Sequence, residues 1–305
     1  MSFFTRINAE NPQSQPLLKF PQLVQTKIIR MMTPPKQHLL SKCSQRTRQS
    51  VKNSASKKHN HEIWIQFRDV SVHYLLKTAG KMQLIHESPG EFSPEDHRYI
   101  CDLFRAPSEI YVIWNGFELS SEEFASNNSI KRSNLLKSDW PHEWMKEYSE
   151  LHTNQDLILL RSFYANSLKS GHSFLEARNL MIVDTKIYCV YPILLSFRGE
   201  HLLMEDVQLG SFFIRVFVEK WMKKSYDRLR TVIFQLHSDS IIRELEFEKF
   251  SGSDRKFQYD SPIKRYHQFP DGIFDCTNGY FIRRETDGKL ATIKITRDYF
   301  MFLVW

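Results

Sequence analysis

The chain has 305 residues, of which 41% are hydrophobic and 25% charged, with ten glycines and twelve prolines. This composition is that of a soluble globular protein and excludes a fibrous or wholly disordered chain. The length predicts about two structural units. The longest apolar run, residues 299–305, is far shorter than the roughly 20 residues that span a bilayer, and residues 1–10 lack a signal peptide's apolar stretch. We therefore expect an intracellular protein, cytoplasmic or nuclear, without a membrane segment.

The four cysteines are isolated from one another. Cys43, Cys101, Cys189 and Cys276 show no paired spacing. Isolated thiols are typical of a reducing compartment, where each serves as a small core residue. Cysteine usage therefore agrees with an intracellular location.

Positive charge is concentrated at the N-terminus. Residues 1–60 hold eleven Lys or Arg against the single acid Glu10, a net +10, which leaves −3 of the chain's +7 for residues 61–305. A basic segment ahead of a nearly neutral body indicates an acidic partner: a protein, a nucleic acid or a lipid surface. A solvated helix face followed by a flexible basic linker is the structural alternative.

The basic region divides into three segments. Residues 1–15 are polar and aperiodic, and we expect them to be disordered. Residues 16–52 predict a small all-α module, whose first helix starts at Phe20-Pro21 and ends before Pro34. Shorter helices follow over 36–43 and 44–52, and the composition of residues 53–61 predicts a basic linker. The first helix has an apolar face formed by Leu23, Val24, Ile28, Met31 and Met32.

From His61 the apolar period changes to two. Residues 62–118 are predicted to form short strands joined by turns, because apolar and polar side chains alternate there. A polar stretch over 115–138 predicts a loop. Helices are expected over 141–148 and 162–170.

The next segment alternates between element types. Residues 193–195 and 201–204 predict strands, and Ser211 is a candidate cap for a helix with Phe213, Val216, Phe217 and Trp221 on one face. Residues 229–236 predict a buried strand. Strand, helix and strand at this spacing indicate a crossover unit with parallel strands.

The C-terminus predicts antiparallel strands. Residues 280–286 and 289–296 flank Asp287-Gly288, a pair that favours a two-residue type I′ hairpin turn. Residues 299–305 predict a last strand covered on both faces. The predicted fold class is therefore α/β with a mixed sheet: a small helical module, then a strand-rich α/β domain over 62–305 that ends in a β-meander.

Motifs for catalysis are absent from the sequence. There is no phosphate-binding glycine loop, no paired Cys/His or HExxH spacing for a metal, and no Gly-x-Ser-x-Gly elbow. A Cys/His pair assembled in space is not excluded by sequence. We expect a binding protein rather than an enzyme, with no catalytic residues, cofactor or metal.

Both ends of the chain resemble one family. Residues 20–52 resemble a nematode-type F-box: Phe20-Pro21, the apolar Val24, Ile28-Ile29 and Met32, then Pro34 and the run Leu40-Ser41-Lys42-Cys43-Ser44 before Arg46 and Arg48. The strands around Asp287-Gly288, the closing residues 300–305 and the segment 216–236 resemble the F-box-associated domain of the same proteins. The similarity is thin between residues 75 and 190.

The resemblance implies an adaptor of a Skp–cullin–F-box ubiquitin ligase. The N-terminal helices would bind a Skp-type adaptor, which in the family is acidic, and the C-terminal domain would bind a protein substrate. A helical unit this short cannot bury much apolar surface by itself, so a partner would cover its apolar residues. The implied adaptor-binding residues are Leu17, Leu18, Phe20, Pro21, Leu23, Val24, Ile28, Leu39, Leu40 and Cys43.

The chain departs from the family at three positions. Gln37 and His38 stand where the family usually has apolar residues, and Pro35 replaces a bulky one. Polar groups at a dry interface cost free energy unless they are partnered. A degenerate F-box module without ligase association is therefore one alternative. The other is a basic nucleic-acid-binding protein, which we do not favour because no aromatic residue lies between Phe20 and Trp64 to stack on bases.

Overall fold

The computed structural model forms two compact units: residues 1–63, 74–87 and 93–108 in the first, and residues 64–73, 88–92 and 109–305 in the second. It describes residues 17–55, 61–68, 71–78, 81–89, 92–114, 130–135, 142–153, 155–161, 168, 171–183, 190–223, 225–238, 256–259, 272–276 and 279–305.

The fold class is α/β, as the sequence predicted. Within the described residues, twelve strands form one mixed sheet in the order β12-β13-β14-β9-β8-β7-β6-β5-β4-β1-β2-β3. Its first three strands along the chain are β1 (Glu62–Arg68), β2 (Ser71–Thr78) and β3 (Lys81–Pro89).

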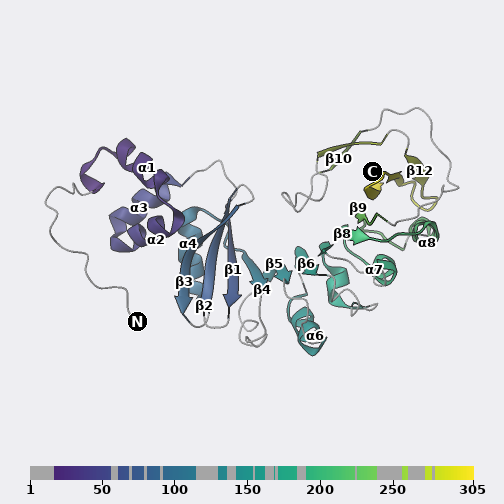
Figure 1. The fold of residues 1–305 in the computed structure, drawn as a ribbon, viewed down its shortest axis with the longest axis horizontal. Coiled ribbons are helices and arrows are strands. Elements are labelled where there is room, and N and C mark those ends of the chain that lie inside the picture. The colour runs from purple at the N-terminus through teal and green to yellow at the C-terminus, as the bar shows by residue number, and fades with distance from the viewer. Residues whose placement is uncertain are drawn as a thin grey trace. The chain divides into compact units, whose positions relative to one another are not determined.

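Three ten-residue helices begin the first unit. They are α1 (Gln22–Met31), α2 (Pro34–Cys43) and α3 (Gln45–Ser54), preceded by a 3-10 turn over Leu17–Lys19. The prolines that end α1 also begin α2, since the first turn of a helix needs no donor there. Ser44 caps α3: its hydroxyl accepts from the Thr47 amide, and the Thr47 hydroxyl accepts from the Ser44 amide. Figure 1 shows these helices gathered at the N-terminal end of the chain.

A fourth helix of the first unit, α4 (Pro94–Phe104), corrects the prediction of strands throughout 62–118. Its start signal is complete: Ser93 accepts from the Asp96 amide, Pro94 occupies the first turn, and two acids follow. Asp102 binds α3 through Arg48 at 3.0 Å and through Lys52. These contacts connect the helical module to residues that the sequence assigned to the next domain.

Three further corrections concern the second unit. Residues 193–195, predicted as strand, belong to α7 (Val190–Ser196), which has Ile193 and Leu194 buried. Ser211 does not cap α8 (Ser211–Met222): the cap position is Gly210, and no side chain caps this helix. The predicted loop over 115–138 contains β5 (Ile130–Leu135). The expected helix over 162–170 lies almost entirely outside the described residues.

The second unit is built on consecutive parallel strands. These are β4 (Ile110–Trp114), β5, β6 (Leu157–Arg161), β7 (Asn179–Val183), β8 (His201–Val207) and β9 (Thr231–Leu236), and each pairs with the next along the chain. Helix α6 (His142–Leu151) lies between β5 and β6 in sequence, α7 between β7 and β8, and α8 between β8 and β9. The predicted crossover with parallel strands is thus confirmed at β8 and β9. It is one of a series of such crossovers, in which the chain coils from each strand to the next as it does in repeat proteins.

Charged residues lie at equivalent positions just before the start of four of these strands. Asp156, Arg178, Glu200 and Arg230 each precede a strand directly, and the register aligns Leu157, Asn179, His201 and Thr231. Arg178 lies 3.6 Å from Asp156 and 3.0 Å from Glu200, whose carboxylate is 3.9 Å from Arg230. Alternating signs therefore favour this register, although each exposed pair contributes only up to about 1 kcal/mol.

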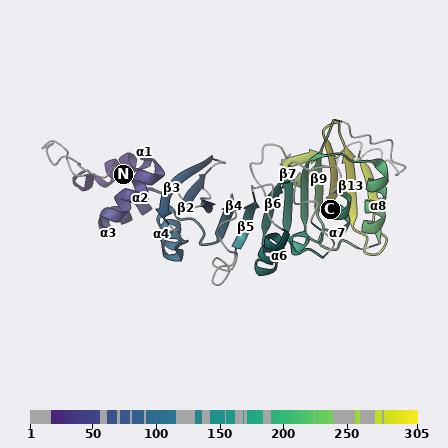
Figure 2. The same cartoon turned by 60° about the horizontal axis from the view of Figure 1, so that its bottom comes forward.

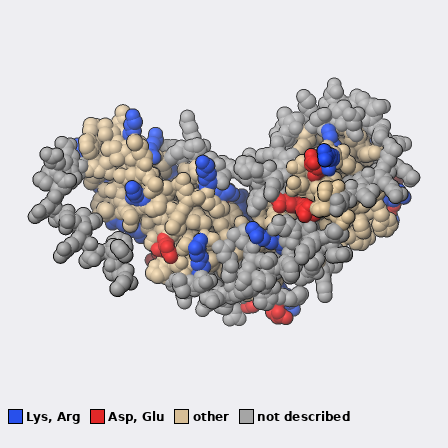
Figure 3. Space-filling view, in the orientation of Figure 1, with Lys and Arg blue, Asp and Glu red and all other residues tan. Residues whose placement is uncertain are grey.

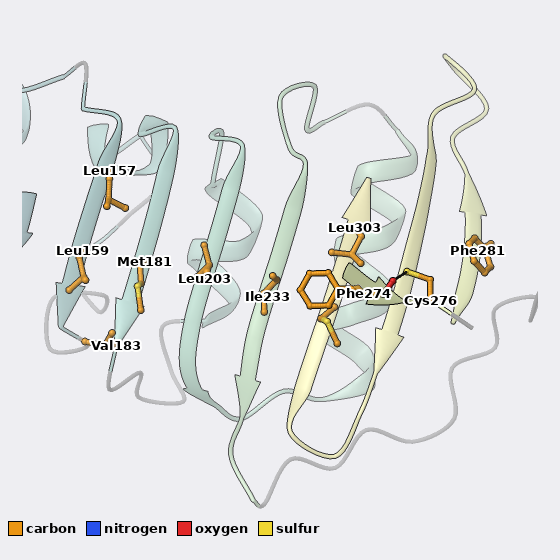
Figure 4. Close-up of a cluster of buried hydrophobic side chains, with 11 residues drawn as sticks. Leu157, Leu159, Met181, Val183, Leu203, Ile233, Phe274, Cys276, Phe281 and Leu303 are labelled. Carbon is orange, nitrogen blue, oxygen red and sulfur yellow. Dashed lines mark hydrogen bonds between the residues drawn. The ribbon is translucent and has the colours of Figure 1, made fainter. Parts of the chain in front are cut away.

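In the second unit, buried side chains lie on both faces of the sheet. On one face α8 packs against β14 (Tyr299–Val304): the rings of Phe217 and Trp221 lie 4.9 and 5.3 Å from that of Phe302. The other face, in front of the helices in Figure 4, carries an apolar cluster. It comprises Leu157, Leu159, Met181, Val183, Leu203, Ile233, Phe274, Cys276, Phe281, Met301 and Leu303. Phe274 comes from β11 (Gly272–Asp275), which pairs with β10 (Lys256–Tyr259).

The C-terminal meander is confirmed. Strands β12 (Tyr280–Arg283), β13 (Leu290–Ile295) and β14 are antiparallel neighbours, and β14 also pairs with β9, so the last strand is held on both sides (Figure 2). The predicted two-residue turn is wrong: Arg283 pairs with Leu290, and only Gly288 has a positive φ, of 72°.

The longer hairpin loop has a side-chain cause. Arg284 is fully buried, forms two hydrogen bonds with Asp287 at 2.8 and 2.6 Å, and lies 4.8 Å over the Trp221 ring. These hydrogen bonds lower the pKa of Asp287 to about 2. The loop therefore bends to bring a carboxylate to a buried guanidinium, which a two-residue turn cannot do.

Candidate functional site

The ten residues implied to bind an adaptor all lie on the helices of the first unit or the turn before them, and none is buried. Leu23 is 81% exposed and Leu39 66%, and Pro21, Val24 and Cys43 are exposed as well. The remaining members are half-buried: Leu17, Leu18, Phe20, Ile28 and Leu40. The implied residues thus form a surface rather than part of the core.

Helix α1 turns large apolar side chains outward. Leu23, Lys27 and Met31 succeed one another at intervals of four residues, and Met31 is 80% exposed. The inward side consists of Gln25 and the fully buried Ile29. The sequence placed Met31 on the apolar face but not among the binding residues. We name the exposed side chains Leu23, Val24, Met31 and Leu39 the helical ridge.

The buried polar residue on the inner side of α1 finds its hydrogen-bond partners within the helical module. The Gln25 side-chain amide donates to the carbonyl oxygens of Phe20, at 2.6 Å, and Leu18, at 3.4 Å. This amide therefore holds the preceding turn against α1. A polar residue occupies the buried position because it makes hydrogen bonds there.

The two polar departures on α2 also face inward. The Gln37 side-chain amide donates to the carbonyl oxygens of Ile29 and Met32, at 2.9 and 3.0 Å, and so caps the end of α1. His38 is buried, with its ring 4.7 Å from that of His86 and 5.9 Å from that of Tyr99. Burial, followed by the neighbouring His86, lowers the pKa of His38 to about 4. Neither side chain belongs to the helical ridge.

Helix α4 neutralises part of the basic segment. Lys42 lies 3.6 Å from Asp96, and Arg48 and Lys52 share Asp102. Lys42 and Arg48 also lie over the Tyr99 ring, at 4.3 and 4.4 Å. Three of the cations that could have contacted phosphates therefore bind the protein itself.

Other cations remain unpaired on the helices. Lys27, Lys36 and Arg46 are exposed and form no ion pair within the described part of the chain. Lys and Arg side chains are visible over the side of the first unit that faces the viewer in Figure 3. The helical ridge thus shares its helices with unpaired positive charge, and this combination suits an apolar partner surface with acidic surroundings.

The structure does bring one Cys/His pair together. Cys101 Sγ lies 3.4 Å from His97 Nε2, one turn apart on α4, and both residues are buried. Burial raises the pKa of the thiol to about 12 and lowers the pKa of His97 to about 4. An activated pair needs shifts in the opposite directions, toward thiolate and imidazolium. This pair therefore has the properties of core residues.

Two further kinds of site have no counterpart among the described residues. No group of three or more His, Cys, Asp or Glu side chains in them is placed to hold a metal ion. No helix in the same ranges has the length and apolar character needed to cross a bilayer.

Comparisons of the chain with protein-family models, with characterised proteins and with solved structures found no match. The F-box resemblance therefore rests on the residues quoted above.

Proposed function

We propose that the chain is a substrate-recruiting subunit of a Skp–cullin–F-box type ubiquitin ligase. The helical ridge binds a Skp-type adaptor, and the second unit binds a protein substrate. The proposal combines the sequence resemblance with one structural observation: an apolar stripe on a short helical module is exposed.

Exposure of the helical ridge carries the proposal. A large aliphatic side chain contributes about 1.5–3 kcal/mol when it is fully removed from water. Leu23, Met31 and Leu39 gain little of this free energy in the isolated chain, because their exposed fractions are 81%, 80% and 66%. Burial by a partner would supply it, less the cost of association.

Charge supports an acidic partner. Lys27 lies between Leu23 and Met31 on the same stripe of α1, and Lys36 is exposed on α2. Such cations increase the rate of encounter with an acidic surface more than they tighten the complex. The polar departures Gln37 and His38 do not count against docking, since both face the module's interior.

Co-purification with a Skp-type adaptor tests the proposal. The double variant Leu23→Asp/Leu39→Asp should abolish capture, because two charges would enter an apolar interface. Both side chains are exposed, so the variant should fold normally, as circular dichroism can verify. The matched control is Phe212→Asp, which changes a 67% exposed aromatic residue on α8. No capture by the unmodified chain, or equal capture by the double variant, would contradict the proposal.

The nucleic-acid alternative makes a different prediction. Binding through phosphates would weaken steeply with salt, with a slope set by the number of neutralised phosphates. In α1, α2 and α3, the cations available for such contacts include Lys27, Lys36 and Arg46, which form no ion pair with described residues. Detectable binding of duplex DNA or RNA at low salt that disappears in Lys27→Glu/Arg46→Glu would support this alternative.

A further inference from the structure

Strand β3 is an uncovered sheet edge in the first unit. It ends the strand order, so among the described strands one row of its backbone N–H and C=O groups has no partner strand. Its first four residues, 81–84, are all exposed, and Met82 and Leu84 are 42% and 40% exposed. An exposed edge of this kind is a template for an added strand.

A pocket of about 330 Å³ adjoins this half of β3. Lys81 and Gln83 line it from β3, Leu76 and Thr78 from β2, and Arg30 and Gln37 from the helices. Successive side chains of a strand point to opposite faces. Met82 and Leu84 therefore face the other side of the strand from the pocket.

The pocket is positively charged. Among the described residues, its lining includes the cations Arg30 and Lys81 and no carboxylate. Lys81 forms no ion pair within the described residues, and Arg30 uses its Nε to donate to the Ser54 carbonyl at 3.0 Å. The terminal nitrogens of the Arg30 guanidinium remain available as donors to an anion.

Backbone carbonyl groups do not cancel this charge. The pocket is close to the ends of α1 and α3, where carbonyl oxygens carry partial negative charge. Gln37 already donates to the carbonyl oxygens of Ile29 and Met32, and Arg30 to that of Ser54. The sign of the pocket is therefore set by its two cations.

We propose that β3 binds an extended acidic segment of another protein as an added strand. The segment's backbone pairs with the edge of β3, an Asp or Glu side chain enters the pocket toward Arg30 and Lys81, and alternate apolar side chains cover Met82 and Leu84. A second copy of this chain is the less suitable occupant, because pairing two β3 edges would bring two cationic pockets together. The site does not depend on adaptor binding by the helical ridge.

Fluorescence anisotropy with the full chain and a labelled nine-residue peptide of alternating valine and glutamate tests this site. We expect saturable binding, weakened about tenfold or more when lysine replaces glutamate and when the backbone amides are methylated. Lys81→Glu should weaken binding of the valine–glutamate peptide by a similar factor and strengthen binding of the valine–lysine peptide. Lys223→Glu, a change of the same charge at an exposed residue that follows α8 and does not line the pocket, is the control and should leave both affinities unchanged.

Several outcomes would overturn the inference. These are no binding of the valine–glutamate peptide, equal binding of both charged peptides, or affinity that is unchanged in a folded Lys81→Glu protein. A dimer in sedimentation that becomes monomeric in Leu84→Asp would instead assign the edge to a second copy. None of these results depends on capture of the Skp-type adaptor, so this inference and the proposed function can fail separately.

Discussion

Helices α1 and α8 have similar apolar periodicity but opposite surroundings. On α8, the stripe of Ile214, Phe217 and Trp221 is fully buried, with two of its rings against Phe302. On α1, Leu23 and Met31 are exposed, and the inward side includes a glutamine. Periodicity therefore shows that a helix has an apolar face, but it does not show whether the same chain covers that face.

The position of each helix in the fold explains the difference. Helix α8 connects two parallel strands of a wide sheet, whose apolar face it covers. Helix α1 belongs to a module of ten-residue helices, whose interior is filled by few side chains, among them Ile29 and Val51. A module of this size has too little interior for all of its apolar residues.

The largest expected difference between the two helices is in stability. Trp221→Ala should lower the free energy of unfolding by about 3–5 kcal/mol, because a buried aromatic ring leaves a cavity and Arg284 loses its ring contact. Leu23→Ala should change it by no more than about 0.5 kcal/mol, since the side chain is exposed. Urea unfolding measures both. A large loss for Leu23→Ala would mean that the helical ridge is part of a core.

Acid should weaken both units through buried histidines. Burial lowers the pKa to about 4 for His38 and His97 in the first unit and for His152 and His201 in the second. Each is neutral when folded, whereas the unfolded chain takes up a proton below about pH 6.5. The free energy of unfolding should therefore fall as the pH drops from about 7 toward 4, and these groups add no further loss below that.

Hydrogen exchange can separate the two units in this experiment. At pH 5, after correction for intrinsic exchange rates, amides of α2 and α4 and amides of β7 and β8 should both be less protected than at pH 7. His38→Leu should reduce the pH effect in α2 and α4 and leave the effect in β7 and β8 unchanged. If the loss of amide protection in α2 between pH 7 and pH 5 is the same in this variant, His38 does not cause it.

The smallest expected effect concerns the cap of α3. Ser44→Ala should cost about 1 kcal/mol, because it removes the hydroxyl that accepts from the Thr47 amide. The next residue of α3 offers a comparison: the Gln45 side chain is exposed and does not cap the helix, so Gln45→Ala should be nearly neutral. Thermal unfolding followed by circular dichroism measures both. Equal effects of the two changes would contradict the assigned cap position.

The sequence predicted most of the elements but missed helix α4. Its start signal, Ser93 followed by Pro94 and two acids, is readable in the sequence. The strands on either side alternate with a period of two, and the prediction extended this period across the helix. The strand predicted at 193–195 failed for another reason: Ile193 and Leu194 are buried in α7, and short apolar runs do not distinguish a strand from a helix.

The coil of parallel strands could be predicted only in part. The sequence indicated one crossover, at β8 and β9, and the register extends it through β4 to β7. The strands that start at Leu157, Asn179 and His201 share little beyond the apolar residues at their following positions, so no repeat is evident in the sequence. The alternating charges of Asp156, Arg178 and Glu200 were the available signal.

The sequence alone determined the α/β class, the three N-terminal helices and the C-terminal meander, because local propensity, apolar period and proline positions specify them. The tertiary structure decided which side of α1 faces water, the inward placement of Gln37 and His38, and the loop that brings Asp287 to Arg284. Exposure and the pairing of buried charges depend on residues distant in the chain, and no local pattern reports what those residues will cover.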